Sequence, residues 1–519
     1  MTTLSATGAE QTGKDTRWAA LYVLCAGMLM IVLDVTVVNV ALPSIQDQLH
    51  FSSASLAWVV NAYLISFGGL LLLAGRLGDL LGRRRIFLAG IALFTAASLL
   101  CGIAHSQALL VGARFVQGVG GAMTSAVILG MIVTMFPKPR DQAKAIGVYA
   151  FVASAGGSVG LLAGGVITQS IDWHWIFFIN IPIGALTAFL AARMLPGDPG
   201  IGLGAGADVP GAILITAALM VGVYAIVGPA ATHGWGDGRT LGLGAASLAL
   251  LAGFLARESA AANPLMPLRI FRSRPVVAAN AIQILSVAGM FGMFFLGALY
   301  LRRVLGYDAL QIGLSFLPVT FAMGTLSIRY SERLVMRFGA RNALLAGLPL
   351  VMAGLALFAR AGVHGSYLTD VLPPMALLGI GAGVAFPSLM TVAMSGATPE
   401  DAGLASGLVN TTAQVGGALG LAVLATLSES RSRTLSHQGL SSAASLTGGY
   451  HLAFWIAAGL VACAIAVVVA TLRSVPAVAH GASEDGTATE QIDMALAGAP
   501  GDGALTETGA RELASPVES

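Results

Sequence analysis

Fourteen apolar runs constrain the fold of this 519-residue chain more than any other feature. A helix rises 1.5 Å per residue, so a run of about twenty residues spans the roughly 30 Å of hydrocarbon in a bilayer. Barrel strands need only about 9–11 residues, and lipid cannot satisfy an open backbone, so the runs predict an all-α integral membrane protein with 14 transmembrane helices. The runs lie near residues 18–42, 56–74, 86–104, 107–135, 145–168, 174–194, 209–229, 240–256, 276–299, 310–329, 342–361, 371–394, 402–427 and 449–472.

Composition excludes a water-soluble enzyme. Hydrophobic residues make up 56% of the chain and charged residues 10%, whereas soluble proteins carry about 25% charged residues. A net charge of +2 is too small for a nucleic-acid binder. The three cysteines, Cys25, Cys101 and Cys463, lie inside apolar runs and form neither a disulfide framework nor a metal site. We expect no enzyme activity, no catalytic residues, no metal and no nucleic-acid partner.

The positions of the basic residues predict how the chain is oriented. The first run is too long for the apolar core of a signal peptide, which has about 7–15 residues. With the N-terminus inside and the runs alternating, 20 of the 27 Lys and Arg residues lie on the inner side and six on the outer side. This distribution obeys the positive-inside rule, so both termini are expected in the cytoplasm. The pair Arg302 and Arg303 is the clearest exception.

A repeated motif indicates two halves. The sequences GRRRIFLAG at 82–90 and GARNALLAG at 339–347 each follow the second run of a six-run set. Parallel halves of this kind are a recurring transporter design, with the substrate site between them near the midplane. The acidic C-terminal stretch is too poor in apolar residues to fold. We therefore predict a cytoplasmic tail at 1–17, a six-helix half at 18–194, an inserted helix pair with linkers at 195–275, a second six-helix half at 276–472 and a disordered cytoplasmic tail at 473–519.

Four motifs resemble those of the major facilitator superfamily, specifically its fourteen-span drug:proton antiporter branch. GRLGDLLGRRR at 75–85 is similar to the superfamily's signature between spans 2 and 3, and LDVTVVNVALP at 33–43 is similar to the first-span pattern of this branch. RFVQGVGGA at 114–122 and WHWIFFINIP at 173–182 resemble its motifs in spans 4 and 6. The resemblance covers residues from about 18 to 472.

The fifth run carries the glycines of the antiporter motif of this branch. They are Gly147, Gly156, Gly160, Gly164 and Gly165. The three at 156, 160 and 164 recur every four residues, so they line one helix face and allow close packing, as do Gly416 and Gly420 in the thirteenth run. The chain departs from the family pattern twice. Leu161 replaces the motif's proline, and Met336 stands where the first half has Asp79.

Asp34 is the one acidic residue that these boundaries leave deep in a span. A carboxylate at that depth costs at least about 2.5–3.5 kcal/mol, so a functional role is expected. Arg114 lies at a matching depth, roughly 12 Å inside the outer face, so the two side chains should interact. We hypothesise that Asp34 carries the proton and that Arg114 keeps it ionised until substrate or conformation separates them. The alternative is a permanent structural ion pair. A single buried acid also predicts a low proton stoichiometry.

The loop between runs 2 and 3 is a candidate gate. In the family this loop favours one state of the transporter, and that role is carried onto Gly75, Asp79, Arg83 and Arg84. Glycine permits a tight turn, and Asp79 can face a helix N-terminus or a nearby arginine. The alternative is that the basic loop serves only to orient the chain in the membrane.

Polar and aromatic residues within the runs are weaker candidates. A candidate substrate cavity comprises Asn39, Tyr63, Gln117, Gln283, Asn410 and Gln414. Most such groups bond between helices, so a minority is expected to line the cavity. Aromatic surface for a cationic ligand could come from Phe291, Phe294, Phe295 and Tyr300, although core packing is the commoner fate.

The resemblance implies a proton-coupled secondary transporter of the cell membrane that exports small lipophilic or cationic compounds. It is expected to act as a monomer in the lipid bilayer without a cofactor, driven by the proton gradient. Residues 8–14 spell an ATP-binding loop, but Asp15 replaces its Ser/Thr and no strand precedes it. The alternatives are a facilitator-type importer or uniporter, which Leu161 supports best, and a membrane sensor that binds a ligand without moving it.

Overall fold

The computed structural model describes residues 4–202, 204, 206–396 and 402–472, and helices cover most of this part of the chain. Within these described residues, fourteen helical segments are long and apolar enough to cross a membrane, which confirms the predicted number. Each expected run coincides with one of them. The expected tail at 473–519 lies outside the described residues. The orientation of the termini stays a prediction.

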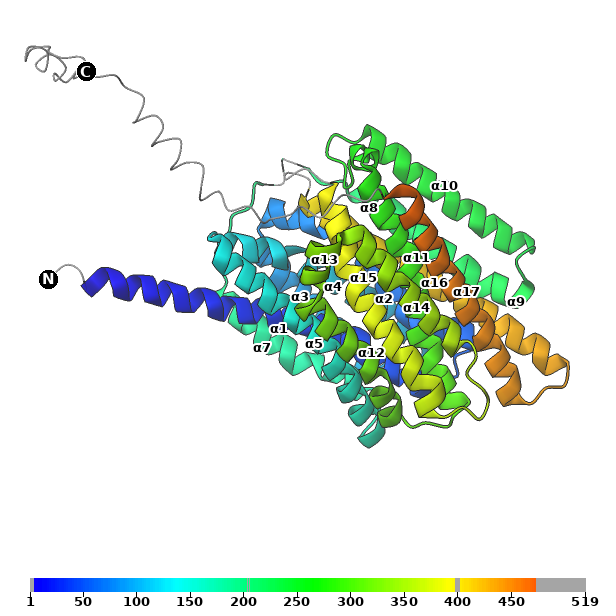
Figure 1. Ribbon diagram of the computed structural model, residues 1–519. Coiled ribbons are helices and arrows are strands. Elements are labelled where there is room, and N and C mark those ends of the chain that lie inside the picture. The colour runs from blue at the N-terminus through cyan, green and yellow to red at the C-terminus, as the bar shows by residue number, and fades with distance from the viewer. Residues whose placement is uncertain (1–3, 203, 205, 397–401, 473–519) are drawn as a thin grey trace, which may run out of the picture. The chain divides into compact units, whose positions relative to one another are not determined.

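Six of the membrane-spanning segments in the described residues belong to the first half, whose helices begin in blue at α1 in Figure 1. Its helices are α1 (Leu4–Leu49), α2 (Ser53–Leu81), α3 (Arg83–Gly102), α4 (Gln107–Met135), α5 (Pro139–Ser170), and α6 (Trp175–Phe178) with α7 (Asn180–Met194) as one span. The first helix begins at Leu4, so it includes most of the segment that was expected to be the N-terminal tail.

The second half also contains six spans. After the short η3 (Leu268–Arg272), its helices are α11 (Arg274–Arg303), α12 (Ala309–Arg329), the short α13 (Ser331–Phe338), α14 (Ala340–Phe358), η4 (Tyr367–Val371) continued by α15 (Leu372–Ser395), α16 (Ala402–His437) and α17 (Ser442–Thr471).

The two halves repeat the same packing pairs. In the first half, α1 packs on α5, α2 and α3 pack on α4, and α3 packs on α7. In the second half, the equivalent spans form the equivalent pairs: α11 with α16, α12 and α14 with α15, and α14 with α17. The halves meet where α2 contacts α16 and α5 contacts α12, again an equivalent pair of contacts. This repetition matches the architecture expected from the repeated motif.

The repeated motif itself has one backbone conformation in both halves. Gly82 separates α2 from α3 with φ +98° and ψ 129°, and Gly339 separates α13 from α14 with φ +80° and ψ 151°. Side chains with a Cβ rarely adopt such positive φ values, so glycine suits both turns.

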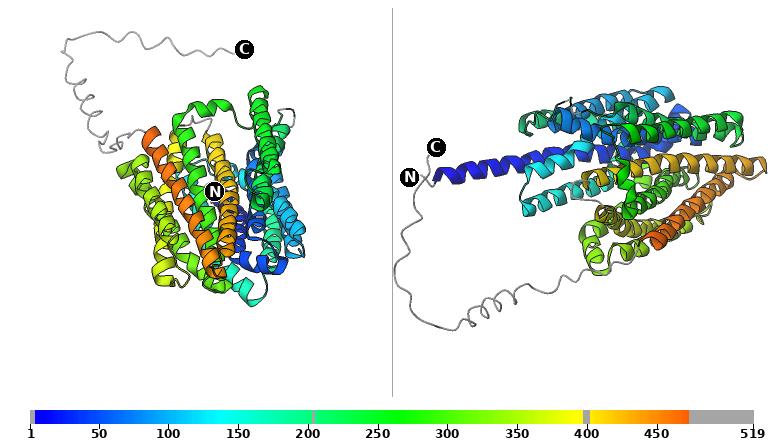
Figure 2. Two further views of the ribbon diagram at one scale, coloured as in Figure 1. Left: turned by 90° about the vertical axis from the view of Figure 1, so that its right-hand side faces the viewer. Right: turned by 90° about the horizontal axis from the view of Figure 1, so that it is seen from above.

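The inserted pair consists of α8 (Val209–Ala225), continued by η2 (Ile226–Ala230) and α9 (Ala231–His233), and of α10 (Gly238–Ala260). The helix α8 contacts α2 of the first half and α16 of the second half, while α10 packs on α8. Accordingly α10 lies on the outside of the bundle (Figures 1 and 2), and Thr240, Phe254 and Glu258 are its buried residues.

Candidate functional site

Asp34 lies on α1 inside the first half and forms an ion pair with Arg114 of α4. The Arg114 guanidinium donates from Nη1 to Asp34 Oδ2 at 2.5 Å, and the exposed fractions of the two residues are 2% and 1%. The contact expected from their matching depth is therefore present. Two buried opposite charges at this distance neutralise each other, but each remains costly to leave alone.

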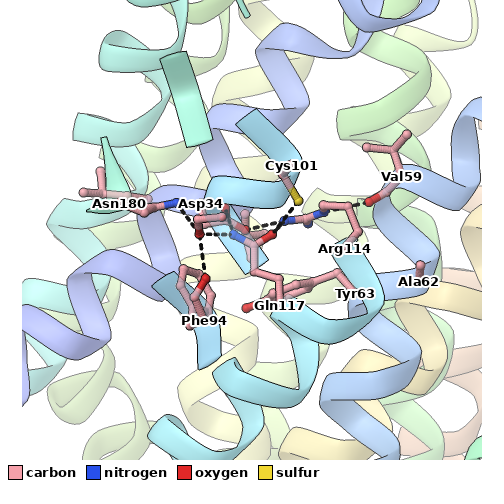
Figure 3. Close-up of polar contacts among 12 residues, drawn as sticks. Asp34, Val59, Ala62, Tyr63, Phe94, Cys101, Arg114, Gln117 and Asn180 are labelled. Carbon is pink, nitrogen blue, oxygen red and sulfur yellow. Dashed lines mark hydrogen bonds and ion pairs between the residues drawn. The ribbon is translucent and has the colours of Figure 1, made fainter. Parts of the chain in front are cut away.

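Amide side chains complete the surroundings of the Asp34 carboxylate (Figure 3). Gln117, one turn after Arg114, donates from Nε2 to Asp34 Oδ1 at 2.7 Å, and Asn180 at the start of α7 donates to the same oxygen at 3.2 Å. Both amides also donate to Ser98 Oγ of α3, at 2.8 and 3.4 Å. The carboxylate thus accepts from three side chains on two helices, and a network across four helices holds it in place.

Arg114 has further partners that do not depend on Asp34. Its Nε donates to the Val59 carbonyl of α2 at 2.9 Å, and Nη1 also donates to Gln117 Oε1 at 2.7 Å. The guanidinium lies over the Tyr63 ring, 4.5 Å from its centroid. These contacts would hold the cation in place if Asp34 took up a proton, because backbone carbonyl, amide and aromatic face all stabilise positive charge. The arrangement therefore permits a carboxylate that exchanges a proton beside a fixed arginine.

The six candidate cavity residues lie in different surroundings. Tyr63 and Gln117 are buried and belong to the Asp34 surroundings. Asn39 and Asn410 donate to the carbonyls four residues earlier, Val35 and Ser406, at 3.1 Å each. Gln283 is buried and Gln414 faces Gly68 of α2. Two cavities of about 590 Å³ are described, and neither is lined by any of the six candidates.

The glycine face of α5 packs on the part of α1 that carries Asp34. A β-carbon on Gly160 would lie 1.9 Å from Thr36 Oγ1, and one on Gly164 would lie 2.9 Å from Val37 Cα. At Gly156 it would meet Leu29 and Val32. The close packing expected from the four-residue spacing is thus present.

The other glycines of the motif differ in their surroundings. Gly165 packs on Ala309 and Leu310 of α12, whereas a β-carbon on Gly147 would meet nothing within 4 Å. The neighbouring Leu161, in the proline position, is fully buried, and its carbonyl approaches Gly313 of α12. In the second half Gly416 and Gly420 pack on α11, as the spacing predicted.

The turn between α2 and α3 is held by charged side chains. Arg83 donates to Asp79 Oδ1 at 3.0 Å and to the Gly130 carbonyl of α4 at 3.0 Å, and Arg84 donates to the Ala192 carbonyl of α7. Asp198 in the following linker accepts from the Arg83 amide at 3.2 Å. Asp79 therefore faces a nearby arginine, one of the two arrangements expected, and Asp198 is an additional anchor that the sequence did not reveal. Gly75 has only Ala126 near its β position, at 4.0 Å.

The halves are also joined by ionic and hydrogen-bonded contacts at the ends predicted to face outward. Arg303 at the end of α11 donates to Gln46 Oε1 of α1 at 3.2 Å and forms an ion pair with Asp47. Glu429 of α16 accepts from the Ala54 amide of α2. The unusual outer arginine pair thus supplies a partner to α1.

Asp34 is not the only buried acid, which corrects one expectation. Asp208 and Glu258, at the ends of the inserted pair, are 2% and 3% exposed. The low proton stoichiometry inferred from a single buried acid therefore loses its basis. Both residues lie just outside the expected runs at 209–229 and 240–256, and the sequence could not show that the chain folds over these helix ends.

Comparison with known proteins gives the family and close relatives. The family model described as the Major Facilitator Superfamily matches residues 24–421. The chain is 39% identical over 450 residues to the puromycin resistance protein pur8 of Streptomyces alboniger, with 86% of this chain and 89% of that protein covered. It is also 39% identical to the cephamycin export protein CmcT of Amycolatopsis lactamdurans, with 82% and 89% covered.

A third relative is similar in sequence, and two solved structures are similar in fold. The tetracenomycin C resistance and export protein of Streptomyces glaucescens is 36% identical, with 80% of this chain and 76% of that protein covered. The nucleoside transporter NupG superimposes with a TM-score of 0.62 at 13% identity, covering 88% of this chain and 100% of that one. An inward-facing, occupied bacterial homologue of the lysosomal transporter Spinster gives 0.61 at 15% identity, with 89% and 99% covered. At such identities the two structures support the fold alone.

Proposed function

This chain belongs to the major facilitator superfamily, as its motifs had suggested, and we propose that it exports small lipophilic or cationic compounds of the antibiotic kind in exchange for protons. It is a multi-pass transporter of the cell membrane. Export is supported by relatives whose names refer to puromycin resistance, cephamycin export and tetracenomycin C resistance and export. We propose that the proton gradient, without a cofactor, supplies the energy, and that the monomer is the working unit.

The observation that carries proton coupling is the buried Asp34 carboxylate with its three side-chain donors. Inside the bundle, a lone charge costs several kcal/mol, so Asp34 is stable either as an anion beside Arg114 or as a neutral acid. When substrate or a conformational change moves α1 relative to α4, the 2.5 Å ion pair lengthens and proton uptake becomes favourable. Restoring the pair releases the proton.

Helix packing connects the protonation state of Asp34 to the contacts between the two halves. Residues 29–37 of α1 rest on the glycine face of α5, and α5 in turn contacts α12 of the second half. The outer end of α1 is bound to α11 through Asp47 and Arg303. A shift of α1 on protonation of Asp34 therefore acts on two of the contacts between the halves, α5 with α12 and α1 with α11. A proton shifts the equilibrium between two conformations only if it binds one of them more tightly than the other, and these contacts would make its affinity differ between them.

The test uses purified protein in vesicles with an imposed pH gradient, and puromycin and a lipophilic cationic dye as probes. A charge crossing 100 mV is worth about 2.3 kcal/mol, or about a fifty-fold gradient of substrate per proton. Wild type should accumulate the probe against the probe's own concentration gradient when protons flow down their gradient in the opposite direction. Asp34→Asn, which cannot ionise, should bind the probe but accumulate none.

Asp237→Asn is the matched control, because Asp237 caps α10 through the Arg239 amide and Asn caps helices equally well. This variant should accumulate the probe as wild type does. Full proton-driven accumulation by Asp34→Asn would refute the assignment. Probe movement that is downhill and independent of pH in wild type would instead identify a facilitator or uniporter, and co-movement of probe and proton would identify an importer.

A further inference from the structure

The inserted helix pair contains two buried carboxylates that lie near one point beside Gly211. Asp208 caps the start of α8, and Glu258 lies in the last turn of α10. The exposed fractions of the two residues are 2% and 3%. A β-carbon built on Gly211 would lie 2.6 Å from Asp208 Oδ2 and 3.1 Å from Glu258 Oε1, so these two oxygens approach the same point.

The other oxygen of each carboxylate is already occupied. Asp208 Oδ1 accepts from the Gly211 amide at 3.1 Å and from Arg257 Nε at 3.0 Å. Glu258 Oε2 accepts from the Met266 amide at 3.0 Å. The remaining oxygens, Asp208 Oδ2 and Glu258 Oε1, are buried and have no hydrogen-bond partner among the described residues. The geometry therefore leaves one unpaired acceptor on each acid, and both acceptors lie beside Gly211.

The surroundings are apolar apart from a few arginines. Leu73 of α2, Ala212 and Leu265 form one buried cluster here, and Phe254 of α10 packs with Met266 and Ile270 in another. Arg257 is bonded to Asp208, and its side chain is 46% exposed. Of the neighbouring elements, α2 carries Arg76, which donates to the Gly206 carbonyl at 3.2 Å, and η3 carries Arg269 and Arg272 in its last turn.

Two neighbouring carboxylates in such surroundings cannot both be ionised at low cost. Like charges on adjacent acids repel, and a buried charged acceptor without a partner costs more free energy than a neutral one. A single proton between the two unpaired oxygens removes both penalties, because the protonated acid then donates a short, charge-assisted hydrogen bond to its neighbour. A cation such as Ca²⁺ takes six to eight oxygen ligands, far more than the two offered here.

We propose that Asp208 and Glu258 bind one shared proton, held between Asp208 Oδ2 and Glu258 Oε1, as a second proton site separate from Asp34. This proton joins the start of α8 to the end of α10. Glu258, held in place by this proton, also accepts from the Met266 amide, so the site anchors the segment that leads into η3 and α11 at the beginning of the second half. The site does not involve Asp34 or its partners, so it stands or falls independently of the transport mechanism.

The first experiment is infrared spectroscopy of the full-length protein in lipid at neutral pH. A carboxyl that keeps its proton gives a carbonyl band distinct from that of carboxylate. This band should be present in wild type and absent in both Glu258→Gln and Asp208→Asn. It should persist in Asp34→Asn and in the control Glu332→Gln, which changes an exposed acid on α13. A missing band in wild type, or a band that survives in both Glu258→Gln and Asp208→Asn, would overturn the proposal.

The second experiment measures the thermal midpoint from about pH 5 to about pH 9, a range above the ordinary carboxyl titrations. The folded protein holds one proton that the unfolded chain releases, so folding should weaken as the pH rises, by up to tenfold per pH unit. The side-chain amide introduced by Glu258→Gln would donate an N–H in place of the proton, so this variant should lose that part of the pH dependence.

Two outcomes of this experiment contradict the proposal. Parallel pH profiles of wild type and Glu258→Gln would show that no proton is held. A midpoint that rises specifically with Na⁺ at constant ionic strength, and does so in wild type but not in Glu258→Gln, would show a metal cation instead. Asp208→Asn, which loses a charge next to Arg257, should have a lower midpoint at every pH but the same flattened profile.

Discussion

Replacement of Gly160 by alanine tests whether α1 and α5 must lie in close contact. The added β-carbon would lie 1.9 Å from Thr36 Oγ1 and 3.1 Å from Thr36 Cβ. Thr36 cannot easily turn away, because its hydroxyl donates to the Val32 carbonyl at 2.9 Å and to the Leu33 carbonyl at 3.1 Å. The helices must therefore separate, and overpacking of this kind costs about 1–3 kcal/mol.

Gly147 provides the matched control on the same helix. A β-carbon there meets nothing within 4 Å, so Gly147→Ala retains only the gain from alanine's helix propensity, up to about 1 kcal/mol. Since Gly160→Ala has the same gain, the difference between the two variants isolates the clash. We expect a lower thermal midpoint and reduced proton-driven accumulation for Gly160→Ala, and neither loss for Gly147→Ala.

A second substitution shows whether Thr36 is the cause. In Gly160→Ala/Thr36→Ala the nearest atoms to the new β-carbon would be the Cβ at position 36, at 3.1 Å, and the Leu33 carbonyl at 3.3 Å, so most of the clash disappears. The double variant should recover most of the midpoint and the transport, with a coupling energy within the roughly 0.5–3 kcal/mol seen for residues in contact. Equal midpoints for Gly160→Ala and Gly147→Ala, or no recovery in the double variant, would refute the reasoning.

Two further predictions concern the ion pairs. Arg114→Met should lower the free energy of unfolding by up to about 3–5 kcal/mol, because Asp34 is then buried without its cation and must either stay charged or take up a proton. Adding Asp34→Asn should recover part of that loss, and losses that simply add in the double variant would contradict this. Arg303→Gln removes an ion pair whose side chains are 37% and 43% exposed, so it should cost only about 0.2–1 kcal/mol. That loss of stability should shrink as the salt concentration rises from about 0.1 M to 1 M, because the Debye length falls from about 10 Å to 3 Å. A loss that does not depend on salt would show that the contact is not electrostatic.

The spans and one site contact could be predicted from the sequence. Length and apolar character fix a membrane helix, and depth along two helices of known direction brought Asp34 and Arg114 to the same level. Gln117 follows Arg114 by three residues, so it shares the same helix face. These inferences use distance along the helix axis, which the sequence gives directly.

Other partners depend on rotation about the helix axis and on how helices pack, which the sequence does not give. Ser98 in an apolar run and Asn180 at a helix start carried no signal that either faces Asp34. The same limit explains why Tyr63 joined the Asp34 surroundings while Asn410 is exposed and bonds its own helix. Asp208 and Glu258 were missed because depth in the membrane was taken as the measure of burial, whereas packing of the linkers buries helix ends as well.

The location of the Asp34 network has an evolutionary consequence. All the described hydrogen-bond partners of Asp34 and Arg114 come from residues before Met194, on α1, α2, α4 and α7. Under the proposed mechanism, the groups that hold the coupling proton therefore all lie in the first half. If Asp34 carries the coupling proton as proposed, the second half could diverge in its substrate contacts without loss of that group, and a chimaera that joins this first half to the second half of a relative should retain proton-driven accumulation.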